Sequence, residues 1–228
     1  IEEIADRTSP LPHTLPAPEQ FAEQVGALGI GNEHHVVIYD NAGGYAAAAR
    51  VWGMFRIYGH DKVSILNGGF KTWLAENRPT ESGEAKPTSA AFKAAYRQEL
   101  VKTADQVAAN ITTQEAQVFD ARGPGRFTAS DPEPRAGLRG GHIPGSMNAP
   151  CPAFIGANGK ILTADEIGTY FKNLGFDPAK PAIGSCGSGV TAWMPIFALY
   201  LIGFDDGAVY DGSWTEWGGR ADLPVETG

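Results

Sequence analysis

One cysteine stands in a glycine-rich turn that has the composition of a reactive site. Cys186 lies within residues 184–189, after the short apolar run 180–183 and before the almost entirely apolar stretch 192–202. An apolar strand, a turn and a buried helix place the sulfur at the carboxyl end of the strand, where backbone N–H groups and a helix N-terminus face it. Such surroundings bind anions and stabilise a thiolate. The alternative is a buried, inert cysteine, and the glycines favour the reactive interpretation because they form a loop rather than core.

Two arginines lie in a polar loop that follows a second candidate strand, residues 117–120. In a parallel sheet, the loops after the carboxyl ends of the strands lie on one side. We therefore expect Arg126 and Arg135 on the side that carries Cys186. The alternative is that both form surface ion pairs with acidic residues of the same region.

Composition and charge limit the classes of partner. Of the 228 residues, 43% are apolar and 19% charged, which is ordinary for a globular protein. The longest apolar run, 192–203, is too short to span a bilayer. A net charge of −8 and a pI near 5.1 argue against nucleic acid or an anionic membrane as a partner. The positive charges that an anionic substrate needs must therefore be placed locally.

The cysteine and histidine content points to a reducing environment without a metal. Only Cys151 and Cys186 are present, and so few cysteines fit a reducing compartment, here expected to be the cytoplasm. Cys151 follows a proline and has no glycine loop, so we expect it to pack inertly. The five histidines lack metal-ligand spacing with either cysteine, so we expect no metal and no cofactor.

The elements that position these residues follow from apolar periodicity and from glycine and proline at their ends. The expected helices are 18–28, 46–58 and 70–77, and the expected strands are 36–39 and 63–66. Strands and helices that alternate at this spacing are typical of parallel βαβ units and hence of an α/β fold.

The same order of strands and helices recurs 144 residues later, which indicates two tandem copies of one domain. Gly59 becomes Gly203 and Trp73 becomes Trp217 under this shift. Matching the preceding strands needs a shift of 146 instead, which sets Asp40 opposite Cys186, whereas 144 sets Ala42 there. The first copy contains no cysteine under either alignment, so we expect one active site per chain.

The expected domains are 1–80, a Pro- and Ser-containing linker at 81–95, and 96–228. The second copy opens with a helix around 103–110 and the strand 117–120, and the first has no equivalent of that strand. A first domain of matching size would need roughly fifty residues before residue 1. We therefore expect the first domain to be truncated at its N-terminus.

Three segments carry a family resemblance. Residues 186–191 read Cys-Gly-Ser-Gly-Val-Thr, residues 210–217 read Tyr-Asp-Gly-Ser-Trp-Thr-Glu-Trp, and residues 141–146 read Gly-His-Ile-Pro-Gly-Ser. They resemble the active-site loop and the C-terminal and N-terminal signatures of the rhodanese superfamily, in the form found in its tandem-domain 3-mercaptopyruvate sulfurtransferases. The resemblance implies two rhodanese-like domains, each a parallel sheet flanked by helices, with the first inactive.

The resemblance also implies roles for individual residues. Cys186 corresponds to the cysteine that carries sulfur as a persulfide. Ser188, His13 and Glu2 match a serine, a histidine and an acidic residue that work with it, although a loop histidine and a terminal glutamate are often merely solvated. The remaining matches concern the substrate: Arg126 and Arg135 at its carboxylate, and Gly187, Gly189, Val190 and Thr191 in the loop around it. Arg122 corresponds to an arginine of intradomain ion pairs.

The resemblance implies a sulfurtransferase that takes sulfur from 3-mercaptopyruvate, releases pyruvate and passes the sulfur to cyanide or a thiol such as thioredoxin. A phosphatase of similar shape would need an arginine six positions after the cysteine, where Ala192 stands. A thiosulfate sulfurtransferase is the nearer alternative, but its relatives place basic residues where Gly187 and Ser188 stand. A non-catalytic binding module would not need Cys186 in its loop.

Overall fold

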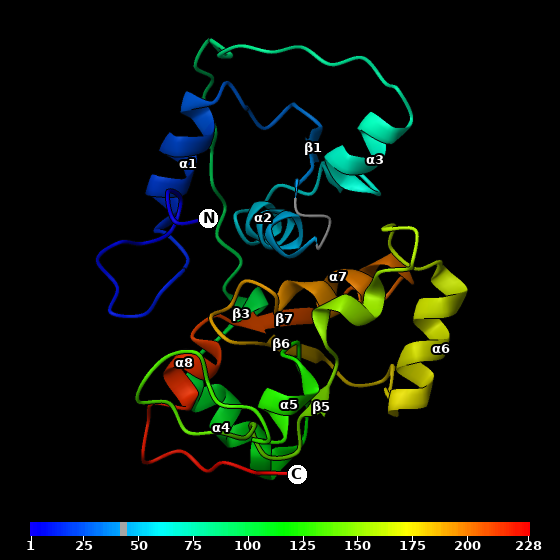
Figure 1. Cartoon of the computed structure of the whole chain (residues 1–228). Coiled ribbons are helices and arrows are strands. Elements are labelled where there is room, and N and C mark those ends of the chain that lie inside the picture. The colour runs from blue at the N-terminus through cyan, green and yellow to red at the C-terminus, as the bar shows by residue number, and fades with distance from the viewer. Residues whose placement is uncertain (42–44) are drawn as a thin grey trace.

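The computed structural model describes residues 1–41 and 45–228 and contains two α/β units in tandem (Figure 1). In each unit a parallel sheet is flanked by helices. The α/β class and the tandem arrangement that the sequence predicted are therefore confirmed.

The first unit contains a sheet of two parallel strands, β1 and β2, in which Val36 lies opposite Val63. Its helix α2 begins at Ala46, inside a run of alanines that favour helix, and ends before a glycine with positive φ at Gly59. The elements are α1 (Pro18–Ala27), β1 (Val36–Ile38), α2 (Ala46–Ile57), β2 (Val63–Ile65) and α3 (Gly69–Ala75).

The second unit contains a sheet of five strands in the order β3-β7-β6-β4-β5, with every neighbouring pair parallel. β6 lies in the middle, and its last residue, Ser185, pairs with Asp120 at the end of β4. The elements are η1 (Gln98–Leu100), β3 (Val101–Lys102), α4 (Ala104–Thr113), β4 (Gln117–Asp120), α5 (Pro124–Phe127), β5 (Met147–Asn148), η2 (Cys151–Phe154), α6 (Ala164–Leu174), β6 (Ala182–Ser185), α7 (Trp193–Leu201), β7 (Gly207–Tyr210) and α8 (Ser213–Trp217).

The internal repeat is visible as a shared order of elements, β1-α2-β2-α3 and then β6-α7-β7-α8. The first strands of the two sets begin 146 residues apart, at Val36 and Ala182, and the second strands 144 apart, at Val63 and Gly207. This spacing favours the alignment that sets Asp40 opposite Cys186. Ala42, the other candidate, lies outside the described residues.

One predicted strand was displaced. The run 180–183 was expected to form it, but β6 occupies Ala182–Ser185. Pro181 has no N–H to donate to a sheet, and the pairing of β6 with β4 continues as far as Ser185. The sheet therefore ends at the residue before Cys186.

The predicted linker, residues 81–95, contains no helix or strand, but hydrogen bonds attach its second half to the first unit. The Ala90 N–H donates to the Gly26 carbonyl at 2.9 Å, and the Ala95 N–H donates to the Tyr58 carbonyl at 2.9 Å. Phe92 is buried in the core of the first unit. Residues 90–95 are therefore held on the first unit, whereas residues 81–89 are exposed, and the domain boundaries at 80 and 95 stay a prediction.

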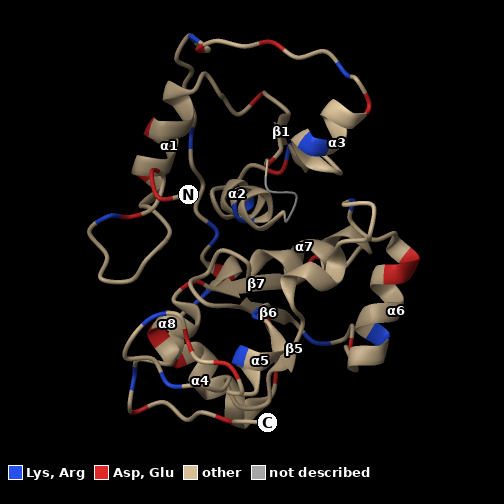
Figure 2. Cartoon of the chain, viewed as in Figure 1, with Lys and Arg blue, Asp and Glu red and all other residues tan. Residues whose placement is uncertain are grey.

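The two units share one apolar core, because α2 of the first lies against α7 of the second (Figure 1). The rings of Trp52 and Trp193 meet edge to face with their centroids 6.1 Å apart. A Cβ at Gly53 would come within 2.3 Å of the Trp193 ring, so only glycine permits this approach. α7 carries no charged residue, whereas α2 carries Arg50 and Arg56 (Figure 2). No helix of the described residues is long and apolar enough to cross a membrane.

Candidate active site

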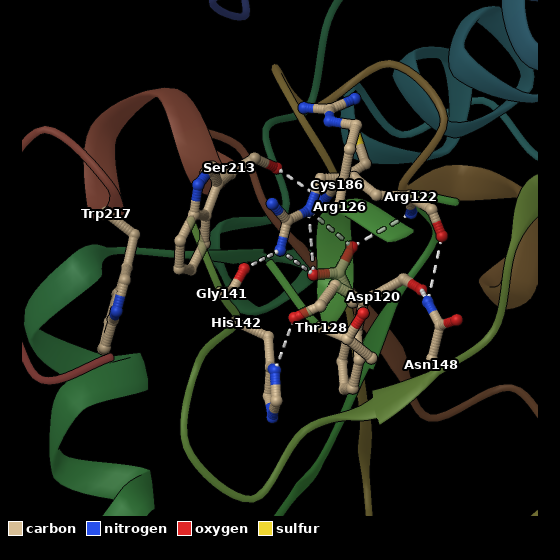
Figure 3. Close-up of polar contacts among 12 residues, drawn as sticks. Asp120, Arg122, Arg126, Thr128, Gly141, His142, Asn148, Cys186, Ser213 and Trp217 are labelled. Atoms are coloured by element: carbon tan, nitrogen blue, oxygen red, sulfur yellow. Dashed lines mark hydrogen bonds and ion pairs between the residues drawn. The ribbon is translucent and has the colours of Figure 1, made fainter. Parts of the chain in front are cut away.

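Cys186 is the first residue after β6, and its side chain is buried. Its backbone is held by the start of α8: its N–H donates to Ser213 Oγ at 3.1 Å, and its carbonyl accepts from the Trp214 N–H at 2.9 Å (Figure 3). Neither bond uses the sulfur. The backbone of the nucleophile candidate is therefore fixed independently of its thiol.

The cysteine loop, residues 186–191, keeps its backbone donors available. Among the described residues, the N–H groups from Gly187 to Ala192 donate to no acceptor. The loop is held through its carbonyls instead, since the Gly187 carbonyl accepts from the Thr215 N–H at 2.8 Å and from the Thr215 hydroxyl at 2.5 Å. Six consecutive donors that precede a helix can bind an anion, such as a persulfide, next to Cys186.

Gly189 must be glycine for the loop to take this course. Its φ is +78°, in the left-handed region, and a Cβ there would lie 2.5 Å from the carbonyl oxygen of Asp211. Val190 and Thr191 are half-buried and continue the loop into α7, where the Thr191 carbonyl accepts from the Met194 N–H at 3.0 Å.

Three predicted residues form a hydrogen-bonded polar row: Ser188, His13 and Glu2. His13 Nδ1 lies 2.8 Å from Ser188 Oγ, and Nε2 lies 2.6 Å from Glu2 Oε1. A carboxylate only accepts, so Nε2 carries the proton toward Glu2, and Nδ1 of the neutral ring accepts from the Ser188 hydroxyl. Glu2 is 78% exposed, whereas His13 is 18% exposed. The structure thus brings together residues from the two units, 175 positions apart.

His13 has a φ of 62°, which is unusual for a residue with a side chain. Its segment is tied down at three points, since Arg50 donates to the His13 carbonyl at 2.6 Å, the Leu15 N–H donates to Asp211 at 2.8 Å, and the Tyr58 hydroxyl donates to the Pro16 carbonyl. Such anchors maintain a strained backbone, a feature that is frequent at functional sites. Sequence reasoning missed Arg50 and Asp211; the available signal was a single charge within the apolar run 46–55.

Arg122 makes the ion pairs within the second unit that its motif predicted. Its guanidinium binds Asp120 at 2.6 Å and the Gly141 carbonyl at 2.7 Å (Figure 3). It also binds Glu133 at 2.7 Å and lies over the Trp214 ring, 4.2 Å from the centroid. With 1% of its side chain exposed, it offers no surface to a substrate.

Arg126 combines the two interpretations that the sequence left open. Its guanidinium binds Glu133 at 2.6 Å, so the expected alternative of an acidic partner is present. It also borders the cysteine loop, because a Cβ at Gly187 would lie 3.2 Å from Arg126 Nη2, and 26% of its side chain is exposed. Arg135 is half-buried and, among the described residues, makes no hydrogen bond or ion pair.

The comparison with family models assigns residues 4–76 and 103–220 to the Rhodanese-like domain. The chain belongs to the rhodanese family. The predicted resemblance is therefore confirmed, and both matched segments carry the rhodanese fold.

Relatives that carry two different enzyme names match this chain almost equally well. Human 3-mercaptopyruvate sulfurtransferase is 44% identical over 97% of the chain and 75% of its own length. Thiosulfate sulfurtransferase of Rattus norvegicus is 45% identical over 100% of the chain and 76% of its own length. The crystal structure of the Escherichia coli 3-mercaptopyruvate sulfotransferase SseA superimposes with a TM-score of 0.84 at 39% identity, covering 93% of the chain and 79% of the other. These names agree with the predicted class of enzyme.

The other cysteine of the chain, Cys151, lies in surroundings that keep its thiol protonated. Cys151 begins η2, is buried and forms no disulfide with Cys186. Burial raises the pKa of its thiol to about 12, and the proximity of Cys186 adds to the increase. Cys151 is therefore protonated at neutral pH and is a poor nucleophile, because the thiolate is the reactive form.

Proposed function

We propose that this chain transfers the sulfur of 3-mercaptopyruvate, through a persulfide on Cys186, to a thiol or cyanide acceptor and releases pyruvate. The observation that carries the proposal is the polar row of Ser188, His13 and Glu2, which ends in the cysteine loop two residues from Cys186. A serine that a histidine can deprotonate or reprotonate suits a substrate that leaves as an enolate and must gain a proton.

In the first half-reaction, the Cys186 thiolate attacks the substrate sulfur and forms an S–S bond. The C–S bond breaks, and its electron pair moves onto carbon to give the pyruvate enolate. The thiol proton of the substrate passes to the Ser188–His13 pair as the persulfide anion forms, and the pair supplies a proton to the enolate carbon, which gives pyruvate. The persulfide stays on Cys186, where the N–H groups of residues 187–192 stabilise its charge.

In the second half-reaction, an acceptor thiolate or cyanide attacks the outer sulfur and regenerates the Cys186 thiolate. A small thiol leaves as its persulfide, and cyanide leaves as thiocyanate. Thioredoxin is our proposed protein acceptor, because its thiolate is available at neutral pH. Such chemistry requires reduced thiols, which favours the cytoplasm as the location.

Thiosulfate is the second candidate donor, because relatives of both names match and Arg126 sets a cation beside the loop. Sulfite leaves with two negative charges and so needs cations near the cysteine. Gly187 and Ser188 are neutral, and Arg126 shares its charge with the buried Glu133 carboxylate. These features favour the donor that carries a single carboxylate.

Side-by-side kinetics with the two donors test the choice. We expect mercaptopyruvate to give the higher kcat/KM and to add one sulfur to Cys186, detected by mass spectrometry of the intact protein and its peptides. Replacing Gly187 and Ser188 together by Arg and Lys should raise the ratio of thiosulfate to mercaptopyruvate activity, because cations favour departing sulfite. The control replaces both by Gln, which adds bulk without charge. Equal ratios in the two double variants would contradict the leaving-group argument.

The two arginines give a separate prediction about the substrate carboxylate. Arg126→Ala and Arg135→Ala should each lower kcat/KM for mercaptopyruvate. The loss of transition-state stabilisation should be about 1.5–3 kcal/mol, the value of a hydrogen bond to a charged group. The double variant should lose less than the sum, because both groups would hold one carboxylate. Lysine should restore only part of the activity, since an ammonium lacks the planar fork.

The measurement is steady-state kinetics at low mercaptopyruvate together with thermal unfolding. Arg135→Ala is the sharper variant, because Arg135 has no ion pair among the described residues and its removal should leave Tm unchanged. Arg78, a surface arginine paired with Glu76, supplies the control Arg78→Ala. Wild-type kcat/KM in both site variants would contradict the proposal that these arginines bind the substrate carboxylate.

A further inference from the structure

Arg50 is the residue that contacts both halves of the candidate site from within the first domain. We infer that Arg50, together with Asp211, is a positioning residue that holds the His13 imidazole at hydrogen-bond distance from the Ser188 hydroxyl. The inference rests on the proposed function for its catalytic consequence. It assigns the cysteine-free first domain a direct part in ordering the active site.

The bonds of the Arg50 guanidinium reach the backbone on either side of the critical contact. Nη2 donates to the His13 carbonyl at 2.6 Å, and Nη1 donates to the Gly189 carbonyl at 3.1 Å. Gly189 follows Ser188 directly, so one planar group fixes the two chain segments whose side chains meet at 2.8 Å. A guanidinium suits this task because the directions of its N–H groups are rigid.

Asp211 completes the arrangement from the loop after β7. Its Oδ1 accepts from Arg50 Nη1 at 2.7 Å, and its Oδ2 accepts from the Leu15 N–H at 2.8 Å. The carboxylate therefore neutralises Arg50 and also holds the chain two residues beyond His13. Burial raises the pKa of the Tyr58 hydroxyl, which keeps it a donor to the Pro16 carbonyl in the same segment.

The cost of burying Arg50 indicates a role beyond stability. Its side chain is 1% exposed, and its Nε is buried without a hydrogen-bond partner among the described residues. A buried ion pair contributes little net stability because both charges lose water. The gain lies in geometry, since a displacement on the order of 1 Å in a catalytic group can cost about a hundredfold in rate.

Arg56 provides a matched control on the same helix. It also bridges the two domains, binding Asp205 at 2.5 Å, and its guanidinium packs over the Trp52 and Tyr200 rings. Its side chain is 13% exposed, and none of its recorded contacts is with the cysteine loop or the His13 segment. Arg56→Lys therefore alters an interdomain contact by losing the planar group over the two rings, without disturbing the proposed contact.

The experiment compares Arg50→Lys and Asp211→Asn with Arg56→Lys in the whole chain. We expect the first two to lower kcat for mercaptopyruvate by about ten- to a hundredfold, with a much smaller change in KM, because substrate contacts remain. The His13 imidazole NMR signals should shift in these two variants and stay in place in Arg56→Lys. Asp211→Asn keeps the side-chain shape and serves if Arg50→Lys fails to fold.

A result in which Arg50→Lys and Asp211→Asn lower Tm as Arg56→Lys does, but leave kcat and the His13 signals unchanged, would overturn the inference. The two measurements distinguish failure of this inference from failure of the proposed function. If the wild type transfers sulfur from neither donor, the proposed function fails, whereas the His13 signals still decide whether Arg50 positions that ring.

Discussion

Cys186→Ser should abolish sulfur transfer from mercaptopyruvate and from thiosulfate while the fold persists. A serine hydroxyl cannot hold a second sulfur as a persulfide, so no intermediate can form. The substitution is nearly isosteric, and the bonds that fix position 186, to Ser213 and Trp214, use only its backbone. Turnover assays, intact-protein mass after exposure to donor, and thermal unfolding measure the three parts of this result.

Cys151→Ser is the control for the nucleophile assignment. Its thiol, with a pKa of about 12, takes no part in the proposed steps, so the variant should keep most of the wild-type turnover. Sulfur found on Cys151 after exposure to donor, or activity that disappears with Cys151 and persists without Cys186, would show that the wrong cysteine has been assigned.

His13→Ala and Ser188→Ala should each lower kcat/KM for mercaptopyruvate by about 10²–10⁴-fold, the usual contribution of general acid–base catalysis. The two side chains meet at 2.8 Å and act on one proton, so the double variant should be little worse than either single one. Glu2→Gln should have a smaller effect, because the Glu2 carboxylate is 78% exposed and water can replace it. Single-turnover kinetics of persulfide formation measure all four variants.

The chain contains its own control for this pair. His35 Nε2 lies 2.8 Å from Ser64 Oγ on the surface of the first domain, so it is a histidine–serine contact of the same length outside the site. His35→Ala should leave the rate of persulfide formation unchanged. Equal losses in His13→Ala and His35→Ala would indicate a general loss of folded protein rather than removal of an acid–base group.

Local chemistry allowed much of the fold and the centre of the site to be predicted from the sequence. Alternating apolar runs ending at glycines such as Gly59 and Gly203 predicted the βαβ units, because those patterns are set by which faces must be buried. The glycine loop around Cys186 depends on residues adjacent in the chain, so it too was visible. One strand was displaced by two residues, since Pro181 and the pairing with β4 set its start.

Only the tertiary structure decided which distant groups meet. The contact of His13 with Ser188 spans 175 residues and exists because α2 packs on α7 and brings the first domain over the cysteine loop. The same packing buries Arg50 against Asp211, and a loop bend gives Arg126 the Glu133 carboxylate as its partner. Apolar periodicity predicts which face of a helix is buried, but it does not predict which element packs against that face. The candidate nucleophile was therefore readable from the sequence and its partners from the family resemblance, whereas the contact between His13 and Ser188 and the Arg50–Asp211 pair beside it required the fold.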